Sequence, residues 1–141
     1  MTTRPPLSAL TDQPLDVAAH EAAVAHPTAG AVVSFAGVVR DHDGGRAVTR
    51  LFYEAHPSAA DILAEVAADI AQDPAVHAIA VSHRIGDLGI GDIALAAAVS
   101  TAHRADAFAA CARLVDEVKA RLPVWKHQIF ADGTDEWVNA P

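Results

Sequence analysis

The chain has only two lysines, Lys119 and Lys126, and they lie on either side of a Leu122-Pro123 break. Arginine carries the rest of the positive charge, and acidic residues outnumber basic ones by 18 to 10. Lysine is the cation most readily turned into a nucleophile, because burial or a neighbouring cation lowers its pKa. Taken singly, each lysine is better explained as a solvated residue near a helix end. The pair indicates chemistry only in combination with other cationic residues.

Three such residues are expected at the ends of secondary-structure elements, where functional groups tend to be exposed. Arg40 follows an apolar segment, and His103 and Arg104 open a predicted helix. Backbone N–H groups at a helix N-terminus bind anions, and arginine adds bidentate contacts to phosphate. Cations there oppose the helix dipole at a cost of up to about 1 kcal/mol, which favours a functional role over a solvated first turn. We therefore expect all three side chains to converge on one anion pocket.

Other candidate motifs are better explained structurally. The turn Asp41-His42-Asp43 is more consistent with hydrated side chains than with metal ligands, and the eight histidines show no HxxxH or HExxH spacing. No metal and no cofactor is expected. The lone Cys111 lies in a helical pattern, so it is interpreted as a buried thiol rather than a nucleophile, and it fits a reducing cytosol.

Hydrophobic periodicity predicts the elements that must position these residues. Residues 1–13 are interpreted as an extended arm, and residues 14–141 as one domain. Pro123 should end the last helix, and Ser58 is a candidate N-cap for the second. Hairpins alternating with helices predict an α+β sandwich with a mostly antiparallel sheet and three helices. The expected helices cover residues 14–26, 59–72 and 102–122, and the expected strands cover 30–39, 48–55, 76–85, 93–100 and 124–130, with a short strand around Trp137.

Composition excludes several classes of function. A net charge of −8 disfavours nucleic acid as a partner, since phosphate backbones are bound by basic surfaces. No apolar run reaches the roughly 18 residues that a membrane span requires. The N-terminal residues lack the apolar core of a signal peptide, so a cytoplasmic location is expected.

Several segments, in this order and spacing, resemble the large, catalytic subunit of molybdopterin synthase. The resemblance extends from about residue 15 to 138, nearly the whole chain. It rests on Gly30–Arg40 (GAVVSFAGVVR) with the following DHDGG turn, Leu51–His56 (LFYEAH), His83–Gly86 (HRIG) with Gly91-Asp92, Ser100–Arg104 (STAHR), Phe108, and Lys119–Lys126 (KARLPVWK).

The resemblance implies an α/β hammerhead-type fold and a homodimer that binds two small ubiquitin-like sulfur carriers, giving a heterotetramer. Each carrier ends in Gly-Gly with a thiocarboxylate, whose sulfur converts cyclic pyranopterin monophosphate (precursor Z) into the dithiolene of molybdopterin. By motif match, Lys119 and Lys126 face the carrier terminus and the substrate. The residues matching pterin- and phosphate-facing positions are Arg40, His103 and Arg104, and Phe35 matches a position near the entering tail.

Two alternatives remain open. A non-catalytic module would dock a ubiquitin-like tail, or bind a phosphorylated metabolite, without chemistry. A Schiff-base lyase would use Lys126 as its nucleophile. The family also often carries a basic residue beyond the final Trp-Val that reaches the neighbouring subunit, whereas Val138 is followed here by Asn139-Ala140-Pro141. Arg46 or Arg50 is the expected replacement if that contribution is retained.

Overall fold

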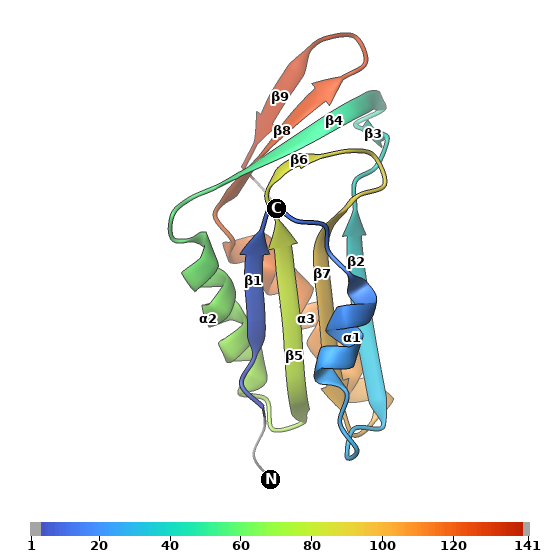
Figure 1. Cartoon of the computed structure of the whole chain (residues 1–141), viewed down its shortest axis with the longest axis vertical. Coiled ribbons are helices and arrows are strands. Elements are labelled where there is room, and N and C mark those ends of the chain that lie inside the picture. The colour runs from blue at the N-terminus through green and yellow to red at the C-terminus, as the bar shows by residue number, and fades with distance from the viewer. Residues whose placement is uncertain (1–3, 140–141) are drawn as a thin grey trace.

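Two β-sheets arranged end to end form the framework of the molecule (Figure 1). The computed structural model describes residues 4–139. The elements are, in chain order, β1 (Leu7–Thr11), α1 (Val17–Val24), β2 (Ala31–Val38), β3 (His42–Asp43), β4 (Arg46–Ala55), α2 (Ala59–Ala71), β5 (Val76–Arg84), β6 (Gly86–Leu88), β7 (Ile93–Thr101), α3 (Arg104–Arg121), β8 (Val124–Phe130) and β9 (Asp135–Val138).

The first sheet has the strand order β1-β5-β7-β2 and carries all three helices. Helices α2 and α3 cover one face and α1 covers the other, so the central strands are buried on both sides (Figure 1). Strand β7 accordingly reads as a continuous apolar run, and its residues 94–101 are all buried. Only β1 pairs in parallel, with β5, so the sheet is mostly antiparallel, as predicted.

The second sheet has β4 at its centre, paired with β3, β6 and β8, while β9 pairs with β8. It lies beyond the end of the first sheet to which α3 runs (Figure 1). The chain enters it at Pro123, where Leu122 is already extended (φ −70°, ψ 119°) and α3 ends as predicted. Residues on α3 and β8 therefore meet at the junction of the two sheets.

Apolar positions three and four residues apart attach α2 and α3 to the first sheet. On α2 the buried face includes Leu63, Val66 and Ile70. On α3 it is formed by Ala107, Ala110, Cys111, Leu114, Val115 and Val118, so the thiol is buried as expected. Ser58 is the N-cap residue of α2, although its side chain makes no capping hydrogen bond.

The predicted α+β class with three helices is confirmed, and four strands differ from the sequence interpretation. The short strands β3 and β6 lie in segments where no strand was expected. Within the segment interpreted as an arm, residues 7–11 form β1 and extend the first sheet. The sequence predicts a strand at residues 30–39 that is buried on both faces. That prediction is wrong, because β2 pairs only with β7 and leaves Val32 and Val38 exposed. Across residues 4–139, the helices are too short or too polar to cross a membrane.

Candidate functional site

A cavity of about 220 Å³ lies at the junction of the two sheets. The first sheet contributes the ends of β2 and β5 and the start of β7, and the second sheet contributes β3, β4 and β8. Lys119 reaches the cavity from the last turn of α3. The polar side chains in its wall are Arg40, His42, Asp43, Tyr53, His83, Lys119, Lys126 and Gln128.

Strand register explains the floor of this cavity. Gly37 and His83 both pair with Leu95, so the three residues form one row on the face that carries α3. A Cβ atom built on Gly37 would lie 3.4 Å from the Leu95 Cβ and 3.4 Å from a Phe35 ring carbon. Because Gly37 has no side chain, the part of the cavity beside Leu95 and Phe35 stays open.

The two lysines come together because the chain reverses at Pro123. Lys126 lies on β8, opposite Tyr53 of β4. Lys119 is an exposed residue, yet partial burial of its amine lowers its pKa, and the positive charge of Lys126 lowers that pKa further. Both effects favour the neutral amine, which is the form that can act as a nucleophile or base. The structure thus brings into one cavity the two lysines that the sequence interpretation paired on their isolation and on the family resemblance.

Arg40 also lines the cavity, beside an acidic residue that the sequence interpretation treated as a hydrated turn. The loop Gly44-Gly45, with φ of 58° and 79°, closes a tight hairpin that places Asp43 in the cavity wall. Its Oδ2 accepts a 2.7 Å hydrogen bond from Nε2 of Gln128, and its Oδ1 lies 3.6 Å from Nη2 of Arg40. The Gln128 hydrogen bond, with the charges of Lys126 and Arg40, lowers the pKa of Asp43 against the effect of burial.

His83 is the most buried polar residue of the cavity wall, with 1% of its surface exposed. Its Nδ1 lies 2.8 Å from the carbonyl oxygen of Arg84, so Nδ1 carries the proton and Nε2 carries the lone pair. The Tyr53 ring packs edge-on at a centroid distance of 4.9 Å. Burial, assisted by the charge of Lys119, lowers the pKa of His83 to about 4. Burial also raises the pKa of Tyr53 to about 12, so both rings are neutral at pH 7.

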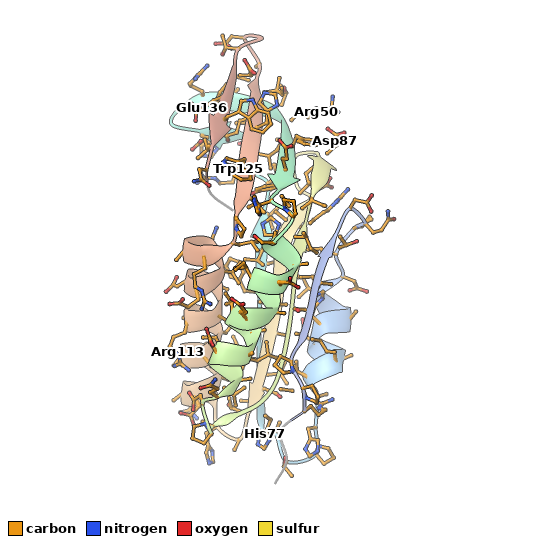
Figure 2. All side chains as sticks on the ribbon, turned by 90° about the vertical axis from the view of Figure 1, so that its left-hand side faces the viewer. Arg50, His77, Asp87, Arg113, Trp125 and Glu136 are labelled. Carbon is orange, nitrogen blue, oxygen red and sulfur yellow. The ribbon has the colours of Figure 1, made fainter. Side chains whose placement is uncertain are left out.

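His103 and Arg104 do not reach this cavity within one chain, and the predicted convergence with Arg40 is wrong at that level. They stand at the start of α3, roughly 22 Å from Lys119 by helix rise. Thr101 pairs with Val76, at the end of the first sheet farthest from the cavity. Figure 2 shows this separation through neighbouring residues, with Trp125 near the junction and His77 at the opposite end. Both His103 and Arg104 are exposed.

Phe35 lies beside the cavity rather than in its wall. It pairs with Ala97, one row farther along the sheet than Gly37, and packs against the core. The two arginines considered as replacements for a C-terminal cation are engaged elsewhere. Arg46 lies 3.7 Å from the centroid of the Phe130 ring, and Arg50 pairs with Asp87 at 2.6 Å (Figure 2).

Tyr53, His83 and Gln128 of the cavity wall were not considered as site candidates from the sequence, whereas His42 and Asp43 were considered as metal ligands and interpreted as a hydrated turn. Tyr53 and His83 do lie within the segments that carried the family resemblance. One further signal was available for Tyr53, because alternation along Val48–Ala55 places it on the same strand face as Leu51. The remaining residues depend on strand register, which a single sequence does not supply.

Comparisons with known proteins assign the chain to a family. The family model described as "MoaE protein" matches residues 10–121. The "Molybdopterin synthase catalytic subunit 1" of Mycobacterium tuberculosis is 42% identical over 134 residues, which cover 94% of this chain and 90% of that protein. The "Molybdopterin synthase catalytic subunit" of Pyrococcus abyssi is 42% identical over 119 residues, covering 83% and 79% of the two chains.

Solved structures show the same fold. Molybdopterin synthase from Staphylococcus aureus superimposes with a TM-score of 0.84 at 34% identity, over 92% of this chain and 94% of that chain. A complex of subunits 1 and 2 of the molybdopterin-converting factor from Helicobacter pylori contains a chain with a TM-score of 0.69 at 18% identity, over 96% of this chain and 90% of that chain, a likeness of fold alone.

The two-sheet α+β fold and these relatives together identify the chain as an enzyme subunit. The chain belongs to the MoaE family, the catalytic subunits of molybdopterin synthase. The family resemblance drawn from the sequence is confirmed.

Proposed function

We propose that this chain transfers sulfur from the C-terminal thiocarboxylate of a small ubiquitin-like carrier to precursor Z, forming the dithiolene of molybdopterin. The observation that carries the proposal is the cavity at the sheet junction. It concentrates Arg40, Lys119 and Lys126 in a chain whose net charge is −8. Such a cavity, with three cations against the carboxylate of Asp43, suits an anionic phosphate and an anionic sulfur donor, because a cleft with an excess of one sign of charge attracts the opposite sign.

The lysines have different environments, which supports different roles for them. Lys119 has a lowered pKa and is the better candidate for nucleophile or base at the reacting carbon. Lys126 lies beside Tyr53 on a strand and adds positive charge to the anion site. Arg40, whose Nη2 lies 3.6 Å from Oδ1 of Asp43, would contact phosphate, since guanidinium binds phosphate oxygens in pairs.

His103 and Arg104 enter this proposal through a second copy of the chain. Strand β2 is an edge strand with Val32 and Val38 exposed, and Phe108 of the adjacent α3 is 61% exposed. Unpaired edges of this kind favour pairing with another strand. An antiparallel β2–β2 contact across a two-fold axis brings the start of α3 in one chain towards the Arg40 end of β2 in the other. A homodimer then supplies both residues to the partner's cavity.

The carrier is proposed to reach Lys119 through a flexible Gly-Gly tail. Glycine has no side chain, so a Gly-Gly tail can pass closer to the surrounding side chains than any other sequence. The Helicobacter pylori chain with the same fold occurs in a two-subunit complex, which is the kind of assembly proposed for this chain. With a carrier on each cavity the complete assembly is a heterotetramer, located in the cytoplasm.

Reconstitution tests the proposal directly. The chain is incubated with precursor Z and a thiocarboxylated carrier, and molybdopterin is detected after oxidation to a fluorescent derivative. Product should appear with the wild-type chain and should depend on the thiocarboxylate, because a carrier with an ordinary carboxylate has no sulfur to give. If a folded wild-type chain binds the carrier but forms no molybdopterin, the non-catalytic binding module replaces this proposal.

A further inference from the structure

His83 is the buried imidazole of the cavity wall, whereas His42, the other imidazole there, is exposed and bonded to Asp41. Lys126 and Arg40, as cations, only donate hydrogen bonds, Asp43 already accepts from Gln128, and Lys119 is the proposed nucleophile or base at the reacting carbon. The imidazole is fixed by the Nδ1 contact to the Arg84 carbonyl and by the edge-on Tyr53 ring. Within residues 4–139 no side chain or backbone group hydrogen-bonds to its Nε2. A fixed acceptor therefore stands in the wall of a cavity otherwise rich in donors.

The proposed reaction requires such an acceptor at one step. When a thiocarboxylate sulfur bonds to a substrate carbon, carrier and substrate become joined by a thioester. Sulfur transfer is complete only when the acyl carbon–sulfur bond breaks. For the carrier to leave as a carboxylate, the new oxygen must come from water, and that water must lose a proton as it attacks.

We propose that His83 is a catalytic residue that accepts the proton of this water through Nε2 and so releases the carrier from the substrate. The water oxygen bonds to the acyl carbon, and the electron pair of the carbon–sulfur bond goes to sulfur. The proton passes to Nε2 and from there to the departing sulfur. The products are the carrier carboxyl group and a thiol on the substrate, and no oxidant or reductant is consumed. This inference rests on the proposed sulfur transfer.

The surroundings of His83 set its protonation state. The Tyr53 ring of β4 packs edge-on against His83, the charge of Lys119 from α3 acts on it, and its strand partner Leu95 of β7 is apolar. The other charged or titratable residues of the cavity wall are Arg40, His42, Asp43 and Lys126. Burial and the Lys119 charge keep the imidazole neutral above about pH 4, so the lone pair is available under physiological conditions. Lys119 is the alternative acyl acceptor, and its attack would give an amide instead of a carboxylate.

Single-turnover experiments separate these outcomes. Wild type, His83→Gln and the control His20→Gln are mixed with thiocarboxylated carrier and precursor Z, and the joined species are followed by mass spectrometry. The introduced side-chain amide retains polarity but takes no proton, so breakdown of the thioester should slow by on the order of 100-fold while its formation changes little. Hydroxylamine, which cleaves thioesters but not amides, should release the accumulated carrier. His20 bonds to Ser82 on the other face of the sheet and should be silent.

Three results would overturn the assignment of His83. The first is a folded His83→Gln variant that breaks down the thioester as fast as wild type. The second is accumulation of the carrier as an amide on Lys119. The third is a His20→Gln variant that slows breakdown as much as His83→Gln does. If His83→Gln does not fold, the wild-type breakdown rate is measured against pH. It should be constant near neutrality and fall only in acid as Nε2 is protonated, and a decline centred in the lysine range would exclude His83. Molybdopterin formation by wild type in the same assay tests sulfur transfer separately.

Discussion

The two ends of helix α3 carry cations in opposite settings. At the C-terminal end, Lys119 lies in a cavity with Lys126 nearby and its pKa is lowered. At the N-terminal end, His103 and Arg104 are exposed, and neither lines the cavity that residues 4–139 form. One end is organised by the fold of a single chain. The N-terminal end has cations that could bind an anion, but no cavity wall surrounds them within residues 4–139. We expect this pattern if a second chain completes the site.

Replacing Lys119 should produce the largest effect. Lys119→Ala is expected to lower molybdopterin formation by roughly 1000-fold, because loss of a nucleophile or base adds to loss of charge at the anion site. Lys126→Ala should lower it strongly but less. Turnover is measured with circular dichroism as the check on folding. Arg50→Ala, which breaks an exposed pair with Asp87, is the matched control and should retain activity. Near-normal turnover by folded Lys119→Ala would show that the reaction does not depend on the lysine at the C-terminal end of α3.

Filling the space above Gly37 should produce the next largest effect. Gly37→Val is expected to reduce turnover by about 100-fold, because its methyl groups occupy the gap that admits the reacting groups. Gly37→Ala should be much milder, since a Cβ atom makes contacts of 3.4 Å that small shifts relieve. Carrier binding measured by calorimetry should separate blocked entry from a misfolded surface. Equal effects of Ala and Val would show that the gap is not the functional space.

Acid should destabilise the junction through His83. Its pKa is about 4 in the folded chain against 6.5 for the ordinary group, so the unfolded chain binds more protons between these values. Stability is therefore lost as pH falls from 6.5 towards 4, by about 2 kcal/mol between pH 7 and pH 5 from this group. Urea unfolding at the two pH values measures the loss. His83→Gln should show a smaller decrease than wild type, and an identical decrease would contradict the neutral, buried assignment.

The exposed end of α3 should give the smallest change. Arg104→Ala is expected to weaken use of precursor Z by about tenfold while carrier binding survives, because one bidentate phosphate contact is lost. Co-refolding Arg104→Ala with Lys119→Ala tests whether the ends meet between chains. Mixed dimers then contain one intact cavity, and roughly a quarter of wild-type activity should return. No recovery despite confirmed mixed dimers would show that the two ends do not share a cavity.

The sequence predicted the elements whose patterns are local. Helix α3 follows from apolar steps of three and four, its end follows from Pro123, and the nearby lysines were correctly paired because only a short turn separates them. Residues 7–11 gave no strand signal, since β1 is a short edge strand beside prolines. The apolar run of β2 does not distinguish a central strand from an edge strand, so its burial was overestimated.

The remaining site residues depend on long-range arrangement. His83 enters the cavity only because β5 pairs with β7 in a register that aligns it with Gly37 across Leu95. Asp43 enters because a two-glycine hairpin turns it inward. For Arg104 the error had another origin, since the motif match gave no distances, and the length of α3 separates this residue from Lys119.

Asp43 gives the cavity a negative charge of its own before any anionic substrate enters. Its carboxylate, held by Gln128 and near Arg40, acts as a tethered counter-ion for the cluster of cations. A free anion gains entry only by outcompeting that resident carboxylate. A phosphate, with two charges and several acceptor oxygens, is expected to compete with this carboxylate better than a singly charged ion does. Asp43 is thus expected to lower the affinity of the cavity for all anions, and to lower it least for anions that carry two charges.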